Sequence, residues 1–130
     1  MFSTLPLYLA FLGTAVGLLV AALAIYLMIT PYHEIGLIRQ GNQAAAYSFG
    51  GTAIGMAIVL YSTASGTFNL LELAAWGAIG LVGQILVFLA VTLMIPGLKK
   101  GLEEDRVAYG VLLGTLSIAM GVLNAGALSA

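Results

Sequence analysis

Two long apolar segments decide the fold: residues 71–95, LELAAWGAIGLVGQILVFLAVTLMI, and residues 107–128, VAYGVLLGTLSIAMGVLNAGAL. A helix of about 20 apolar residues crosses the ~30 Å hydrocarbon core of a bilayer, and both segments reach that length. The stretch between them, PGLKKGLEEDR (96–106), holds three of the four basic residues and three of the five acidic residues of the chain. This pattern predicts two membrane crossings joined by a short charged loop.

The composition extends this prediction to the whole chain, in which 62% of the 130 residues are hydrophobic and 7% are charged. A soluble domain carries about 25% charged residues, so the solvent of this chain must be the lipid bilayer. The net charge of −1 provides no basic surface for nucleic acid. Because the chain has no cysteine and one histidine, we expect no disulfide, no metal centre and no cofactor.

A second pair of apolar segments precedes the first pair. We expect four spans, at residues 7–29, 44–61, 71–95 and 107–128, within one domain covering residues 1–130. The first six residues lack Lys and Arg, so the first span is expected to be retained and not cleaved as a signal. Pro31 and Pro96 are expected to end the first and third spans. The prediction is an all-α membrane protein of four transmembrane helices, arranged as two hairpins in a bundle.

Polar residues at the segment boundaries indicate helix caps. Asn42 is the predicted N-cap of the second span, Asn69 that of the third and Asp105 that of the fourth. Glu72, three residues after Asn69, completes a pattern similar to a capping box and favours the positive end of the helix dipole. Residues 62–69 are small and uncharged, which predicts a turn between antiparallel helices.

The loops and aromatic residues carry further predictions. Residues 32–43 leave room for a short interfacial helix, in which we expect His33 and Glu34 to be solvated. The i,i+4 spacing of Lys99 with Glu103, and of Lys100 with Glu104, predicts a short exposed helical turn. Tyr8 and Tyr26 lie near the two ends of the first span, where aromatic rings favour the headgroup level.

The basic residues predict the orientation of the chain. Arg39, Lys99, Lys100 and Arg106 all lie in the first and third loops, and none lies in the second loop or at either end. By the positive-inside rule the first and third loops are cytoplasmic, and both termini face the opposite side of the membrane.

The two halves of the chain, residues 1–62 and 63–130, are similar in sequence. LMITP at 27–31 is similar to LMIP at 93–96, and NQAAAYSFGGT at 42–52 is similar to DRVAYGVLLGT at 105–115. Both halves cross the membrane in the same order, so duplication would give parallel repeats related by an axis along the membrane normal. Chance similarity between two Ala/Gly-rich helices is the alternative explanation.

Two stretches carry a family resemblance: TPYHEIGLIRQGNQAAA at 30–46 and DRVAYGVLLGTLSIAMG at 105–121. With Gly50, Gly51 and Gly55 beyond the first stretch, they resemble the YjfL-like family of small bacterial inner-membrane proteins, and the match covers nearly the whole chain. The resemblance implies an integral inner-membrane protein of unknown function and, for some members, a link to envelope-stress systems. In an inner membrane, the orientation predicted from the basic residues makes both termini periplasmic. It implies no reaction and no assigned site.

Glycines spaced for helix packing occur in three of the four spans. Small residues at i,i+4 let helix backbones approach closely in lipid. Packing inside one chain and self-association into a homo-oligomer are both open readings of this pattern. The residues are Gly13, Gly17, Gly51, Gly55, Gly110, Gly114 and Gly121.

Three polar residues of the spans are candidates for a pathway or for polar packing. Gln84 lies near the middle of the third span, where an unsatisfied amide costs several kcal/mol, so it must face a partner or a wet cavity. Asn124 lies toward the end of the fourth span. Glu72 has a sufficient account as a cap, and cation attraction or proton coupling is its functional alternative.

No carboxylate pair, nucleophile–base set or phosphate loop is present, so we expect no enzyme. Two functions remain. The first is a homo-oligomeric channel or passive pathway that uses Gln84, with Glu72 at its outer mouth. The second is a membrane scaffold that recruits a cytoplasmic or envelope-stress partner through its charged loops. The loop residues for this role are Arg39, Lys99, Lys100, Glu103, Glu104 and Arg106.

Overall fold

The computed structural model describes residues 5–30, 34–66 and 69–129, and within them the chain forms helices and no strand. The six helices are α1 (Leu5–Ile29), α2 (Glu34–Arg39), α3 (Gln43–Ser65), α4 (Leu70–Met94), α5 (Leu98–Glu103) and α6 (Val107–Ser129). Four of them, α1, α3, α4 and α6, are long and apolar enough to cross a membrane. The prediction of an all-α membrane protein with four transmembrane helices is confirmed. Pro31 and His33 lie outside the described residues.

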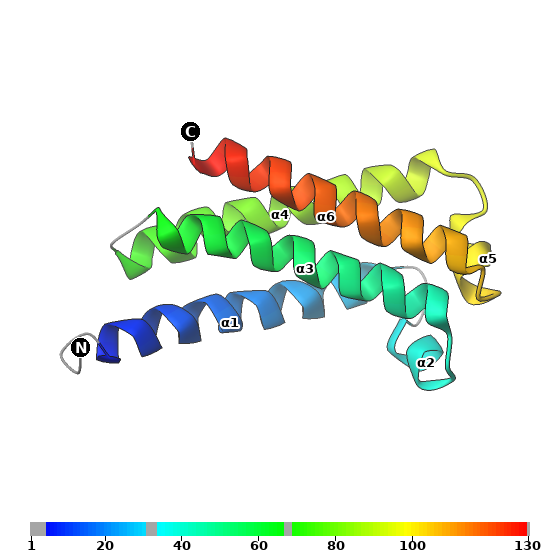
Figure 1. Cartoon of the computed structure of the whole chain (residues 1–130), viewed down its shortest axis with the longest axis horizontal. Coiled ribbons are helices and arrows are strands. Elements are labelled where there is room, and N and C mark those ends of the chain that lie inside the picture. Colours follow the sequence, from blue (N-terminus) through cyan, green and yellow to red (C-terminus); the bar gives the residue numbers. More distant parts are fainter. Residues whose placement is uncertain (1–4, 31–33, 67–68, 130) are drawn as a thin grey trace.

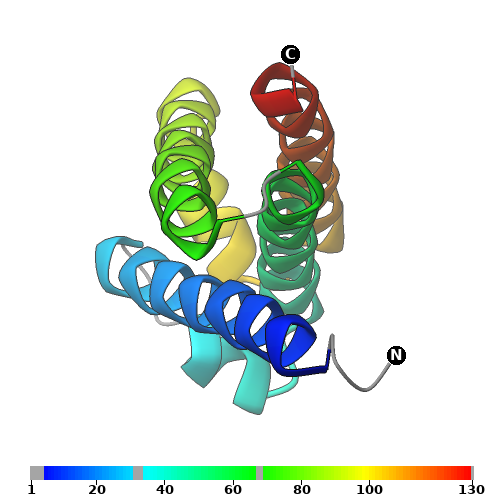
Figure 2. The ribbon, with the colours of Figure 1, turned by 90° about the vertical axis from the view of Figure 1, so that its left-hand side faces the viewer.

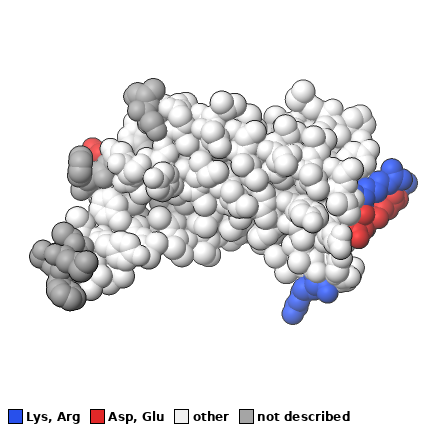
Figure 3. Space-filling model, in the orientation of Figure 1, with Lys and Arg blue, Asp and Glu red and all other residues white. Residues whose placement is uncertain are grey.

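The four long helices run alongside one another, with the two short helices at one end of the bundle (Figure 1). The helices that begin and end the chain, α1 and α6, have their outer ends at the opposite end of the bundle (Figure 1). On the face drawn in Figure 3, the basic side chains gather at the end that carries α2 and α5. The short helices of the first and third loops, α2 and α5, therefore lie at the same end of the bundle.

α3 and α6 form the central pair, and their backbones touch. A Cβ atom at Gly121 would lie 2.6 Å from the carbonyl oxygen of Gly55, and a Cβ atom at Gly51 would meet the backbone of Gly114. Gly110 faces the backbone of Ala44 in the same way. The glycines of the second and fourth spans therefore pack against each other inside one chain, because the absence of side chains allows this approach.

Gly13 and Gly17 behave differently. A Cβ atom at either position would meet nothing within 4 Å, so these two glycines pack against no other helix in the described part of the chain. α1 uses another face for its contacts, which carries the buried residues Ala22 and Tyr26. No contact among the described residues supports intrachain packing for Gly13 and Gly17, and self-association through them stays a prediction.

The second transmembrane helix is longer than predicted. α3 continues from Tyr61 to Ser65 and is capped at Gly66, so residues 62–65 of the turn predicted at 62–69 are helical. The hydroxyl groups explain the difference: Ser62 Oγ donates to the carbonyl oxygen of Ala125 at 2.8 Å, and Thr63 Oγ1 donates to that of Val59 at 3.0 Å. These bonds hold the end of α3 on α6 and within its own helix. α4 ends at Met94, two residues before Pro96, as expected.

Two of the three predicted caps are confirmed and one is wrong. Asn42 accepts from the N–H of Ala45 at the start of α3, and Asn69 accepts from that of Leu71 at the start of α4. Asp105 does not cap α6. Its Oδ1 accepts from the N–H of Ala44 at 2.9 Å, in the first turn of α3.

The physical reason is the left-handed backbone of Asp105, which has φ 59°. Asp105 terminates α5 in the same way that Gly41, which has φ 88°, terminates α2. In both places the next N–H bonds back to the helix, from Asn42 to Leu37 O and from Arg106 to Gly101 O, each at 2.9 Å. This is the Schellman pattern of helix termination. The motif recurs in both halves of the chain, with Asp105 matching Gly41 instead of Asn42; duplication itself stays a prediction.

Candidate functional site

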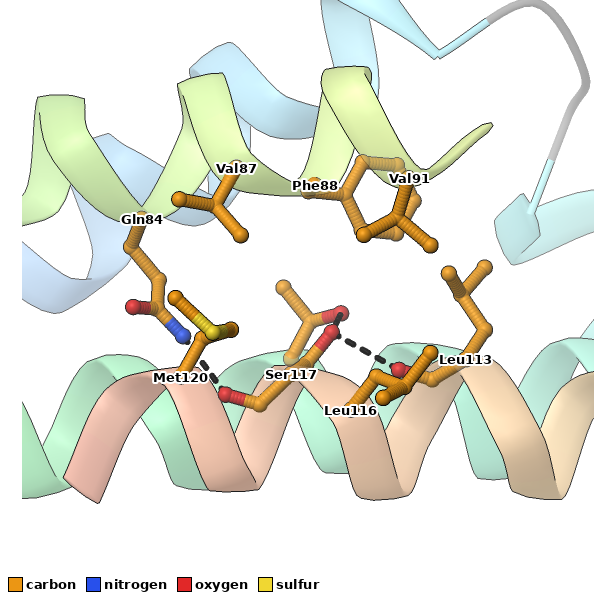
Figure 4. Close-up of a pocket in the computed structure, with 9 residues that line it drawn as sticks. Gln84, Val87, Phe88, Val91, Leu113, Leu116, Ser117 and Met120 are labelled. Atoms are coloured by element: carbon orange, nitrogen blue, oxygen red, sulfur yellow. Dashed lines mark hydrogen bonds between the residues drawn. The ribbon is translucent and has the colours of Figure 1, made fainter. Parts of the chain in front are cut away.

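Gln84 of α4 reaches across to α6 at the centre of the bundle (Figure 4). Its Nε2 donates to the carbonyl oxygen of Ser117 at 2.7 Å, and the residue is 3% exposed. The same Nε2 lies close to Gly55 of α3, where an added Cβ atom would be 2.7 Å away. One amide therefore touches both helices of the central pair, and the bond holds α4 on that pair.

The oxygen of the Gln84 amide has no partner. Oε1 is buried and accepts no hydrogen bond from any described residue. Figure 4 shows this oxygen turned away from Phe88, while the nitrogen points to α6. A buried acceptor in hydrocarbon costs several kcal/mol when it is left unpaired. Gln84 Oε1 is therefore a place where a hydrogen-bond donor from outside this chain would lower the free energy.

A small internal cavity adjoins Gln84 on its Phe88 side. Its volume is about 10 Å³, and its walls include Thr52, Leu113 and Ser117 (Figure 4). That volume is at the lower limit for a single water molecule. Thr52 Oγ1 and Ser117 Oγ meet beside it at 3.4 Å, and each donates to a carbonyl of its own helix. The polar groups inside one chain therefore do not form a continuous path at the level of Thr52 and Ser117.

A larger groove lies between α4 and α6, which stand apart at the edge of the bundle (Figure 2). Its volume is about 290 Å³, and Gln84 forms part of its wall. Asn124 of α6 lies in the same wall and donates from Nδ2 to the carbonyl oxygen of Gly80 at 2.9 Å. The structure therefore brings together Gln84 and Asn124, which the sequence placed on separate spans, beside one groove.

The other predicted site residues lie at the two ends of the bundle. Glu72 is exposed in the first turn of α4, away from the Gln84 groove. At the other end, Lys100 lies 3.9 Å from Glu104, and Arg106 lies 3.4 Å from the same carboxylate. Arg39 ends α2, and Lys99 and Glu103 are exposed on α5. These charged side chains surround the short helices and do not reach the interior site.

The sequence analysis missed a buried pair near the end of the bundle that carries α2 and α5. Glu34 was expected in solvent and Tyr26 at the headgroups, but they are 1% and 0% exposed, and Tyr26 Oη donates to Glu34 Oε1 at 2.8 Å. The Tyr26 ring also packs edge-on against Phe88 at 4.6 Å between ring centroids. α2 folds back under α1, so its first residue enters the bundle. The apolar residues around Glu34 in the sequence EIGLI are the only signal of this burial.

The hydroxyl of Tyr26 is expected to stabilise the fold. Replacing Tyr26 by phenylalanine removes a buried donor to Glu34 and should lower the free energy of unfolding by about 2 kcal/mol. Denaturant unfolding in detergent micelles measures the change. Tyr8→Phe is the matched control because Tyr8 is 59% exposed, and it should leave stability unchanged. Equal effects of the two substitutions would show that the buried bond contributes nothing.

Comparisons with known proteins agree with this architecture. The family described as Domain of Unknown Function (DUF350) matches residues 1–128. The chain is 37% identical over 120 residues to the UPF0719 inner membrane protein YjfL of Escherichia coli (strain K12), covering 92% of this chain and 91% of that protein. It is 28% identical over 113 residues to the UPF0719 transmembrane protein YshE of Bacillus subtilis (strain 168), covering 85% and 84%. No solved structure matches the chain. The four-helix membrane protein described here therefore belongs to the DUF350 family.

Proposed function

We propose that this protein is a homo-oligomeric channel for ions or small solutes in a bacterial inner membrane, with both termini periplasmic and no enzymatic activity. The name of the relative in Escherichia coli supports the inner membrane as its location. The basic residues at the end formed by α2 and α5 support a cytoplasmic position for that end.

One observation carries the channel proposal: the buried, unpaired Oε1 of Gln84 beside an open groove at mid-membrane depth. In lipid alone this acceptor would stay unsatisfied at a cost of several kcal/mol. Water in a hydrated path would satisfy it. Asn124 of α6 adds a second amide to the same wall.

The path requires more than one copy of the chain. The cavity of about 10 Å³ inside one chain is too small for a continuous column of water, and the touching backbones of α3 and α6 leave no passage between them. Gly13 and Gly17 present an unused surface on α1 that allows close approach of a second copy. An oligomer would place the grooves of several chains around or along one path.

Ion and solute flux from liposomes tests this proposal. Gln84→Leu should reduce the flux at least tenfold, because leucine fills similar volume and removes the only polar group of α4 in the groove. Thr115→Val is the matched control, since Thr115 is exposed on α6 and bonds only within its own helix. Circular dichroism verifies that both variants stay folded. Absence of flux in the unmodified protein at every gradient, voltage and pH would overturn the proposal.

A scaffold that recruits a cytoplasmic or envelope-stress partner is the second candidate. The gathering of charge around α2 and α5 favours it (Figure 3). Exchanging the exposed Lys99 and Glu103 keeps the net charge and leaves Asp105 in place on α3. A scaffold would lose partner crosslinking in this variant and keep it in Gln84→Leu, and a channel would show the reverse pattern for flux.

A further inference from the structure

The groove between α4 and α6 has the dimensions of a ligand site. Its volume of about 290 Å³ is close to the lower end of the range of about 300–1,000 Å³ that is usual for small-molecule pockets. Gly83 and Ala127 leave space where larger side chains would fill it, and Val87, Met120 and Leu123 supply apolar walls. Such walls bind an apolar chain, and the amides of Gln84 and Asn124 give the groove two fixed polar points.

The groove opens sideways toward the bilayer. Leu128 bridges α6 to α4 beyond Asn124: a Cβ atom at Gly80 would lie 2.8 Å from Leu128 Cδ1. The hydrogen bond from Asn124 Nδ2 to the carbonyl oxygen of Gly80 closes the groove at the same level. Leu123, at the outer edge of the groove, is 64% exposed. A molecule in this groove therefore enters from the hydrocarbon region, between α4 and α6.

The unpaired oxygen determines the chemistry of that molecule. Oε1 carries partial negative charge and requires a hydrogen-bond donor. Acyl chains and ester groups of ordinary lipids have no donor. An ammonium group is a donor, but a charge at this depth is costly. The complementary group is a neutral hydroxyl on an apolar body.

We propose that the α4–α6 groove binds a neutral amphiphile of the bilayer whose hydroxyl group donates to Gln84 Oε1 and whose chain lies along Val87, Met120 and Leu123. The bound hydroxyl takes the place of water at Gln84. The effect on flux rests on the proposed channel function: the occupied groove closes the path, and the empty groove admits water. The binding itself requires no conduction.

Two probes that differ in the donor alone test the site. 1-Dodecanol and dodecyl methyl ether are titrated into the purified protein in detergent, and native mass spectrometry counts the bound molecules. The wild-type chain should bind the alcohol about fivefold more tightly than the ether, as one additional hydrogen bond within the membrane predicts. Equal affinity for the two probes would overturn the proposal and indicate apolar filling of the groove.

Two variants complete the test. Gln84→Met keeps the length of the side chain and removes Oε1, so the preference for the alcohol should disappear. Ala127→Leu fills the groove from α6 and keeps Gln84, so binding of both probes should fall. A preference for the alcohol that persists in Gln84→Met, or unchanged binding of both probes in Ala127→Leu, would overturn the proposal. Selective binding without any flux contradicts the channel and leaves the site standing. Flux without selective binding contradicts the site and leaves the channel standing.

Discussion

Replacing Gly51 by alanine is expected to lower the free energy of unfolding by about 3 kcal/mol, a large effect for a single methyl group. The new Cβ atom would meet the backbone of Gly114 on α6. A flexible side chain can rotate away from an added methyl group, but a backbone cannot, so α3 and α6 must move apart. Thermal unfolding in detergent, followed by circular dichroism, measures the loss.

The same substitution at Gly17 is expected to have the opposite sign. A Cβ atom there meets nothing within 4 Å, and alanine favours a helix over glycine by about 1 kcal/mol. Gly17→Ala should therefore stabilise the isolated chain. If it also weakens self-association in a crosslinking assay, α1 lies at the contact between copies. A neutral effect of Gly51→Ala would contradict the close packing of α3 and α6.

The sequence was sufficient for the number and type of the helices, because hydropathy and length alone decide whether a segment crosses a bilayer. It was insufficient to predict which of these helices pack against one another. The Gly-x-x-x-Gly pairs of α1 and α3 look alike, yet Gly51 meets α6 and Gly17 meets nothing inside the chain. The i,i+4 spacing of the glycines indicates that another helix can approach closely. Which helix does so depends on the packing of the whole bundle.

Gln84 was predictable as the central candidate because it is an amide in the middle of an apolar span. Its partner was not, since the acceptor is the backbone carbonyl of Ser117, and any residue offers a backbone carbonyl. The burial of Glu34 was missed for a related reason. It depends on the way α2 folds back under α1, and a six-residue helix carries too little periodicity to reveal which side faces inward.

Asp105 illustrates how a local pattern can indicate the wrong helix. An acidic residue before an apolar segment is typical of an N-cap. Here the position is also the end of α5, where a left-handed residue is needed and aspartate tolerates that backbone. The carboxylate then turns toward Ala44 of α3. The sequence gives both possibilities, and only the geometry of the α5–α6 connection separates them.

Replacing Asn42 by alanine is expected to have the second large effect. It should lower the free energy of unfolding by about 2 kcal/mol. Asn42 Oδ1 accepts from the N–H of Ala45 at 2.8 Å, and its Nδ2 donates to the carbonyl oxygen of Leu102 at 2.7 Å. The first bond begins α3, and the second ties it to α5, which is 60 positions away in sequence. Since Asn42 is 8% exposed, water replaces neither bond readily.

Asn69→Ala separates the two contributions, because the side chain of Asn69 makes one bond to the described residues, the cap bond to the N–H of Leu71 at 2.8 Å, in an exposed position. That variant should lose about 1 kcal/mol, the cost of a cap alone. Asp105→Asn keeps an acceptor for the N–H of Ala44, so its effect on stability should be close to neutral. The double substitution of Asn42 and Asp105 by alanine should depart from additivity by at least about 0.5 kcal/mol, because both residues fix the same turn of α3 to α5. If Asn42→Ala costs no more than Asn69→Ala, the bond from Asn42 to Leu102 contributes nothing to the free energy of unfolding.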